Sequence, residues 1–290
     1  MISIIISSYL PHYFSALENN IAETIGNIPY EIIKIDNPGL MGICEAYNKG
    51  AEKARFDCLL FTHEDILFNT GSWGERLIKH LDVPHSGIIG LAGSSYVPVA
   101  PSSWTVSEKY NSVNILQGNK KNTDSYLIKT TKENRNPVYA VDGVFLAIKR
   151  ENFNQYKFDD ALKGFHGYDL DLSLRVSKHL QNYVIDDILI QHFSSGNLDK
   201  KWLDANITVK QKTGSRFQRK IDRKTEEKVF LSFLYKYFEY YPVDKKNILF
   251  TLKFYPYKYL SFAQHLGIAK KYYNYMKYAP DINKKLNTNA

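Results

Sequence analysis

Polar side chains suited to nucleotide and metal chemistry stand directly after short apolar segments of this sequence. An aspartate can accept a hydrogen bond from a base N–H or a ribose hydroxyl, and a tyrosine can stack on a nucleobase. A neighbouring glutamate and aspartate can hold a hard divalent cation against phosphate oxygens. Three clusters contain such residues: Ser7, Ser8 and Tyr9; Asp36 and Asn37; and His63, Glu64 and Asp65.

These clusters form one site only if the segments before them are neighbouring strands. In an open parallel sheet, ligands bind beyond the carboxyl ends of the strands, so the three clusters would meet at one edge. Each cluster alone is also explained by turn formation and helix capping. Their occurrence after three successive apolar segments favours a shared ligand site.

The spacing of apolar residues predicts alternating strands and helices over about the first 200 residues. Short β-branched runs indicate buried strands, and apolar residues three or four positions apart indicate helices. This alternation is typical of an α/β fold whose mostly parallel sheet is flanked by helices. The expected strands are Ile2–Ser7, Tyr30–Asp36, Cys58–Phe61, Gly87–Leu91, Val138–Ile148 and Tyr183–Ile190, and the expected helices are Tyr13–Ile25, Ile43–Ala54 and Trp73–Leu81. The polar stretch Ser94–Pro137 fits neither pattern.

Two carboxylates stand at the start of a further expected helix. Asp169 and Asp171 follow the turn glycine Gly167. A helix N-terminus holds a carboxylate rigidly and keeps it ionised, so Asp169 can serve as a general base. The alternative is that Asp169 only caps the helix. Asp171 is two residues further on and points elsewhere.

Two other positions have both a functional and a structural interpretation. Asp142-Gly143 interrupts an apolar strand, which indicates either an opening for a ligand or a β-bulge. His192 follows the last expected strand, where a neutral imidazole could complete a metal shell and Ser194–Gly196 could bind diphosphate oxygens. A structural role for His192 stays open.

The order and spacing of these motifs resemble the nucleotide-binding half of the family 2 glycosyltransferases, which adopt the GT-A fold. That family has the pattern Gly-x3-Ala-Arg-Asn-x-Gly, followed by Phe-x-Asp-x-Asp. This chain has Gly42-x3-Ala46-x-Asn48-x-Gly50 and then Phe61-x-His63-Glu64-Asp65. His63 stands at the first position of the usual Asp-x-Asp. In this the chain resembles a subgroup of bacterial polysaccharide transferases that have His-x-Asp there. Phe165–Arg175 resembles the family's Gly-Glu-Asp-x-x-Leu-x-x-Arg, with Tyr168 where glutamate is common.

The resemblance implies a role for each candidate residue. It assigns nucleotide contacts to Ser7, Tyr9, Asp36, Asn48 and Glu64. It assigns a Mg²⁺ or Mn²⁺ ion to Asp65, with His63 and His192 as further candidate ligands. It places Asp169 at the position of the general base, and Asp142, Gly143 and Asp171 near the acceptor.

The distribution of charge divides the chain near residue 200. Residues 201–290 contain 16 Lys and 3 Arg against 7 acidic residues, and 11 of the 22 tyrosines. We expect a catalytic domain over 1–200 and a basic, aromatic-rich helical appendage over 201–290. The appendage could pack on the catalytic domain, bind an anionic membrane surface or form a homodimer. No recognition motif accompanies its charge, so we do not expect nucleic-acid binding.

Cys44 and Cys58 stand among apolar residues and are expected to be reduced core residues of a cytoplasmic protein. The first residues lack the features of a signal peptide, and no run of apolar residues is long enough to cross a membrane. The protein is therefore expected in the cytoplasm, either free or as a peripheral protein at the inner membrane face.

The resemblance, together with these residues, implies an inverting, metal-dependent glycosyltransferase. It would move a sugar from a nucleotide diphosphate sugar to a saccharide acceptor, free or lipid-linked, in the synthesis of a bacterial surface polysaccharide. The alternative is a non-catalytic protein of the same fold that binds a nucleotide sugar or carbohydrate, because the first carboxylate of Asp-x-Asp is replaced. A nucleotidyltransferase would be expected to carry a Gly- and Lys/Arg-rich phosphate loop after the first strand, which Ser7–Pro11 does not resemble.

Overall fold

The protein forms two compact units. The computed structural model describes residues 1–119, 122–194, 196, 198–218 and 220–288. Unit 1 consists of Met1–Tyr96 and Ser107–Asn197, and unit 2 of Val97–Val106 and Leu198–Ala290. Unit 2 therefore includes a segment from within the first 200 residues that no change of composition marks.

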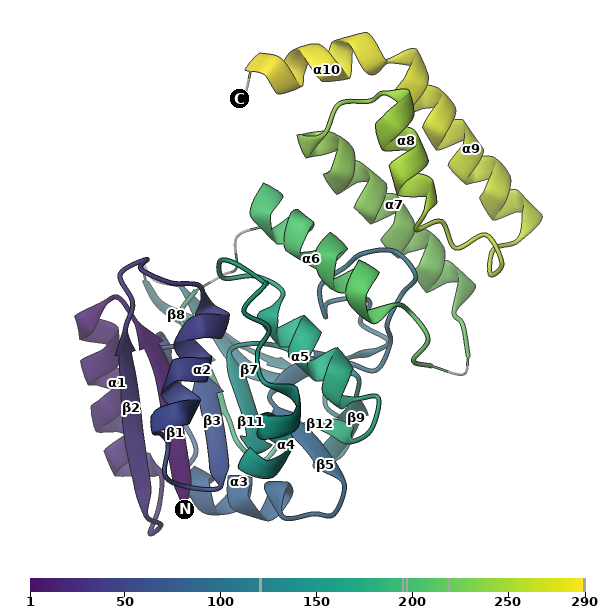
Figure 1. Ribbon diagram of the computed structural model, residues 1–290. Helices are drawn as coiled ribbons and strands as arrows, with labels where there is room; N and C mark the ends of the chain where they lie inside the picture. The colour runs from purple at the N-terminus through teal and green to yellow at the C-terminus, as the bar shows by residue number, and fades with distance from the viewer. Residues whose placement is uncertain (120–121, 195, 197, 219, 289–290) are drawn as a thin grey trace. The chain divides into compact units, whose positions relative to one another are not determined.

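A seven-stranded sheet forms the centre of unit 1 (Figure 1). β1 pairs in parallel with β2 and β3, and β5 pairs in parallel with β12. β11 and β9 run antiparallel to their neighbours, so five of the seven strands share one direction. This confirms the predicted α/β fold. In spatial order the strands are β2 (Tyr30–Asp36), β1 (Ile2–Ser8), β3 (Cys58–Thr62), β11 (Phe145–Lys149), β5 (Ser86–Gly90), β12 (Gln181–Ile185) and β9 (Arg135–Val138).

Helices cover this sheet because their apolar residues recur at three- and four-residue spacings. Phe14, Leu17 and Ile21 are the buried residues of the first helix, which begins at Pro11, where the missing proline N–H costs no hydrogen bond. A Cβ at Gly50 would lie 2.2 Å from Ile5 Cγ2, so this glycine lets the second helix approach β1 closely. The helices of unit 1 are α1 (Pro11–Thr24), α2 (Ile43–Lys53), α3 (Trp73–Leu81), α4 (Arg150–Tyr156) and α5 (Tyr168–Val176).

A second sheet lies beside the first and corrects two expectations. Part of the unassigned stretch Ser94–Pro137 forms the hairpin β7–β8 of this sheet. The expected single strand Val138–Ile148 is wrong, because the chain turns at Asp142-Gly143 between β10 and β11. The strands are, in order, β10 (Ala140–Val141), β6 (Ala92–Ser94), β7 (Asn111–Asn119), β13 (Ile190–His192) and β4 (Ile66–Phe68), with β8 (Asn122–Lys129) paired to β7.

Unit 2 is helical, as expected for the C-terminal region. The side chains of Asp199, Asp222 and Asp244 each accept a backbone N–H at the start of a helix. Phe230 and Phe233 are buried among the aromatic residues of its core. None of the helices in the described ranges is long and apolar enough to cross a membrane. The helices are α6 (Lys200–Thr213), α7 (Arg223–Tyr240), α8 (Lys245–Leu252), α9 (Phe262–Lys277) and α10 (Ala279–Thr288).

Buried polar side chains attach the segment Val97–Val106 to these helices. Lys210 Nζ donates to the carbonyl oxygen of Pro98 at 2.6 Å, and Glu226 accepts the backbone N–H of Val99 at 3.0 Å. Burial lowers the pKa of Lys210 to about 7, against the opposing effect of Glu226. These contacts make the segment part of unit 2.

Candidate functional site

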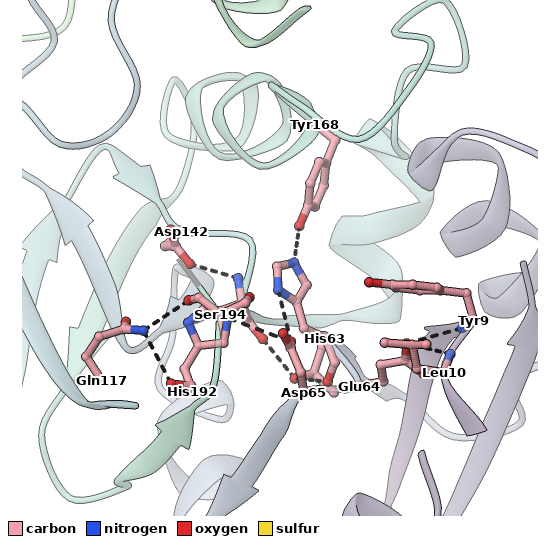
Figure 2. A network of polar contacts seen from close by, with 12 residues as sticks. Tyr9, Leu10, His63, Glu64, Asp65, Gln117, Asp142, Tyr168, His192 and Ser194 are labelled. Carbon is pink, nitrogen blue, oxygen red and sulfur yellow. Dashed lines mark hydrogen bonds and ion pairs between the residues drawn. The ribbon is translucent and has the colours of Figure 1, made fainter. Parts of the chain in front are cut away.

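Two histidines and an aspartate form a candidate metal centre in unit 1 (Figure 2). His63 follows β3, Asp65 precedes β4, and His192 ends β13. The antiparallel pairing of β13 with β4 places His192 opposite Ile66, one residue beyond Asp65. Asp65 Oδ1 lies 3.9 Å from His63 Nδ1 and 3.7 Å from His192 Nε2. The three predicted metal ligands are thus brought together.

The chemistry and spacing of these three residues fit a divalent cation. Two ligand atoms that are each about 2.1 Å from one ion lie at most about 4.2 Å apart, and both distances to Asp65 meet this limit. One carboxylate and two imidazoles suit Mn²⁺, Fe²⁺ or Zn²⁺ better than Mg²⁺, which prefers oxygen ligands.

Tyr168 orients the first of the two histidines. Its hydroxyl oxygen lies 2.8 Å from His63 Nε2. His63 Nδ1 faces Asp65, and a metal-binding nitrogen carries no proton. With a cation held at Nδ1, Nε2–H would therefore be the donor and the Tyr168 oxygen the acceptor. Burial raises the pKa of Tyr168 well above its ordinary value, so the phenol stays neutral. A Cβ at Gly143 would lie 2.1 Å from the Tyr168 hydroxyl, so a glycine is needed there.

A cavity of about 210 Å³ extends from this cluster along the ends of β1, β2 and β3. Three predicted clusters contribute to it, since Ser7, Asn37 and His63 all line it. The exposed ring of Tyr9 is available for stacking on a planar ligand. The lining residues are Ser7, Tyr9, Leu10, Tyr13, Asn37, Ile43, Tyr47, His63, Glu64, Asp65, Phe165, Tyr168 and Ser194. Ser195 lies outside the described residues.

Glu64 combines a structural role with a free acceptor atom. Its Oε1 accepts the backbone N–H groups of Tyr9 at 3.2 Å and Leu10 at 3.0 Å, which fixes the chain just before α1. Its Oε2 is buried and has no hydrogen-bond partner among the described residues. A buried carboxylate oxygen without a partner is costly, and a hydroxyl or N–H of a ligand would satisfy it.

Two residues predicted to bind nucleotide do not line the cavity. The Asp36 side chain is largely exposed and pairs with Lys34 at 2.8 Å. Its neighbour Asn37 lines the cavity instead and donates to Ser7 Oγ at 3.2 Å. Asn48 Nδ2 donates to the Phe158 carbonyl oxygen at 2.9 Å, and its Oδ1 accepts the Phe158 N–H at 3.1 Å. Asn48 therefore anchors α2 to the loop after α4, and its nucleotide contact stays a prediction.

Asp142 and Asp169 form a pair of carboxylates next to Tyr168. Asp169 Oδ2 accepts the Gly143 N–H at 3.1 Å, and Asp142 Oδ1 accepts the Val144 N–H at 2.9 Å. Burial, together with the negative charge of Asp142, raises the pKa of Asp169 to about 7, and three backbone N–H groups oppose this shift. Near neutral pH, Asp169 therefore exists in both protonation states, because burial outweighs the helix N-terminus that was expected to keep it ionised. A group with both states populated suits general acid–base catalysis.

Asp171 is part of the core. Its carboxylate is fully buried, and Oδ2 accepts Arg175 Nε at 2.8 Å and a terminal guanidinium nitrogen at 2.7 Å. This ion pair, one helical turn apart, holds α5 to the carbonyl oxygens of Tyr156 and Lys157 through Arg175. These contacts give Asp171 a structural role, and its contact with an acceptor stays a prediction.

Gly143 gives room to the Tyr168 side chain. The space that a side chain at position 143 would fill is occupied by the Tyr168 hydroxyl. The predicted contact of Gly143 with an acceptor sugar stays a prediction.

A larger cavity of about 900 Å³ lies in unit 2, between α6, α7 and α8. Stacked aromatic rings, including Tyr237 and Tyr241, line it together with Lys245, Lys246 and Lys253. It holds none of the predicted site residues, so size alone does not identify the site of chemistry.

Comparison with protein families gives one match over most of the chain. A family model described as "Glycosyltransferase like family" matches residues 15–229. A search of curated proteins finds no significant match.

Solved structures share the fold at low sequence identity. The S. aureus TarS 1–349 structure in complex with UDP is 13% identical with a TM-score of 0.52, and the match covers 82% of this chain and 72% of that one. A second structure of S. aureus TarS 1–349 is 12% identical with a TM-score of 0.50, and the match covers 88% of this chain and 81% of that one. GalNAc-T7 with UDP, GalNAc and Mn²⁺ is 11% identical, TM-score 0.50; the match covers 73% of this chain but only 47% of GalNAc-T7. These likenesses confirm the GT-A fold.

Proposed function

This chain belongs to the glycosyltransferase-like family, and from that premise we propose that it transfers a sugar from a nucleotide diphosphate sugar to a saccharide hydroxyl. The observation that carries the proposal is the cluster of His63, Asp65 and His192, of which His63 and Asp65 line the same cavity as Tyr9 and Glu64. A cation site beside a stacking residue suits a ligand that joins a base to a diphosphate.

The cavity supplies distinct groups for the donor. Tyr9 would stack on the base, and Glu64 Oε2 would accept a hydroxyl or N–H of the nucleoside. Ser7 and Asn37 would supply further polar contacts at the same strand ends. The TarS and GalNAc-T7 structures are complexes with UDP, which makes UDP the first nucleotide to test.

His63, Asp65 and His192 would hold the cation, for which we propose Mn²⁺. GalNAc-T7 was crystallised with Mn²⁺, and two imidazole ligands favour Mn²⁺ over Mg²⁺. A bound cation supplies positive charge against the diphosphate that leaves. Asp65 keeps the two imidazoles in place by facing both, and Tyr168 fixes the proton of His63 on Nε2.

Asp169 is proposed as the general base. Inversion requires a carboxylate that takes the proton of the acceptor hydroxyl as its oxygen attacks the anomeric carbon from the side opposite the diphosphate. Asp169 is half-buried, its pKa is raised to about 7, and one of its oxygens accepts the Gly143 N–H. Asp142 tunes this pKa and would contact the acceptor.

The setting we propose is the synthesis of a bacterial surface polysaccharide at the cytoplasmic face of the membrane, with a lipid-linked saccharide as one acceptor class. The basic charge of residues 201–290 supports this setting, because the cytoplasmic leaflet carries anionic lipids.

A second candidate is a binding protein that has lost catalysis. His63 stands where Asp-x-Asp has its first carboxylate, which is the observation that favours it. Hydrolysis of nucleotide sugars in the absence of an acceptor separates the two, since a binding protein would be stabilised by the ligand but would not turn it over.

A further inference from the structure

Helix α9 of unit 2 has two apolar faces, of which only one is covered. Ile268 and Tyr272 are buried, and the Tyr272 hydroxyl is hydrogen-bonded to Thr251 Oγ1 of α8 at 2.9 Å. Tyr275 stacks at a tilt on Phe238 of α7, with a centroid distance of 4.6 Å. These contacts hold α9 against α7 and α8, which lie beside it (Figure 1).

The other apolar face is exposed. Phe262, Leu266, Tyr273 and Met276 keep 78%, 57%, 60% and 54% of their surface accessible. At 3.6 residues per turn, these four side chains and the exposed Ala269 fall within an arc of about 80°. They form one continuous row along the helix, centred about 100° from the buried face. We name these five residues the apolar row.

Lysines and tyrosines border the apolar row. Lys270 and Lys277 lie along one edge of it, and Tyr257, Tyr259 and Tyr278 are exposed just before and after α9. Residues 244–290 contain nine lysines and two acidic residues, and all nine lysines are exposed. An apolar row with lysines beside it and tyrosines at both ends is the pattern of helices that lie in a membrane interface.

We propose that the apolar row of α9 docks unit 2 on an anionic lipid surface, with the apolar side chains among the acyl chains and the lysines at the headgroups. Charge complementarity decides the occupant. A second copy would bring another strongly positive surface against this one, whereas anionic headgroups neutralise it. Docking does not depend on sugar transfer, so it can fail while the proposed transferase activity stands.

The test is co-sedimentation of the full chain with vesicles of phosphatidylcholine alone or mixed with phosphatidylglycerol. The wild type is expected to bind the mixed vesicles, and less so as NaCl rises, because exposed charges are screened. Phe262→Asp/Leu266→Asp should weaken binding at least about tenfold, since both apolar contacts are lost and two negative charges are added. Both side chains already face water, so the melting temperature and nucleotide-sugar hydrolysis should be unchanged.

Tyr126→Asp is the matched control. It also replaces an exposed aromatic residue by a carboxylate, but on β8 of unit 1. It should bind mixed vesicles like the wild type. Undiminished binding by the double variant, or equal binding to neutral vesicles, would overturn the proposal. So would a wild-type dimer in sedimentation velocity that the double variant dissociates, because the apolar row would then be the contact between copies.

Discussion

Replacing Asp169 by asparagine separates catalysis from helix capping. Asparagine keeps the shape of the side chain and can still accept the Gly143 N–H, so the helix start should be preserved. It cannot take a proton from the acceptor. General-base catalysis contributes about 10²–10⁴-fold, so kcat should fall by that order while the affinity for the donor nucleotide stays nearly the same.

The raised pKa of Asp169 gives this prediction a second readout. A carboxyl whose pKa is higher in the folded protein than in the unfolded chain binds its proton more tightly when folded. Its contribution to stability is full below about pH 4 and is lost as the pH rises to about 7. A shift of about three units corresponds to on the order of 4 kcal/mol, an upper limit because Asp169 is partly accessible. Asp169→Asn should therefore unfold at higher urea than the wild type at pH 8.

The assay is transfer or hydrolysis of the nucleotide sugar across pH, combined with urea unfolding. For the wild type, kcat/KM should rise with pH around an apparent pKa near 7. Asp142→Asn removes the neighbouring negative charge, so this rise should move to lower pH. A variant Asp169→Asn that is less stable than the wild type and turns over normally would refute the assignment and leave only a capping role.

Three other substitutions test the positions around this centre. Tyr168→Phe removes the hydrogen-bond acceptor for His63 Nε2–H, so titration calorimetry should show Mn²⁺ binding weakened by about 10–100-fold. Unchanged affinity would mean that Tyr168 only packs in the core. Gly143→Ala places a methyl group against the Tyr168 hydroxyl and should weaken Mn²⁺ binding similarly, whereas a normal affinity would mean that the Tyr168 ring shifts without consequence. Asp171→Asn leaves Arg175 without its charged partner, so the free energy of unfolding measured in urea should fall by about 3 kcal/mol. The folded variant should retain its kcat. A variant that is as stable as the wild type but has reduced affinity for the acceptor would instead favour an acceptor role for Asp171.

The sequence predicted the meeting of three strand ends because parallel neighbours bring their carboxyl ends to one edge. Ser7 and His63 line the cavity for this reason. It did not predict which of two consecutive residues at a strand end faces the cavity, and here Asn37 does so while Asp36 pairs with Lys34 at the surface.

Other features depend on contacts between residues far apart in the chain, and one depends on a local helix spacing. The bond between His63 and Tyr168 joins residues 105 positions apart, and no local pattern indicates it. Asn48 was assigned from its place in a family motif, whereas its partner in the structure is Phe158, far along the chain. The pairing of Asp171 with Arg175 was accessible from the sequence, because residues four apart on a helix face each other.

The central claim is that the cluster of His63, Asp65 and His192 is a metal centre for turnover of a nucleotide sugar. The most direct test is a screen of nucleotide sugars, beginning with those of UDP, for hydrolysis by the full chain with Mn²⁺. We predict hydrolysis of at least one of them, abolished both by chelation and by Asp65→Ala, whose melting temperature should match the wild type. Hydrolysis that persists in Asp65→Ala, or stabilisation by a nucleotide sugar without any turnover, would contradict the claim.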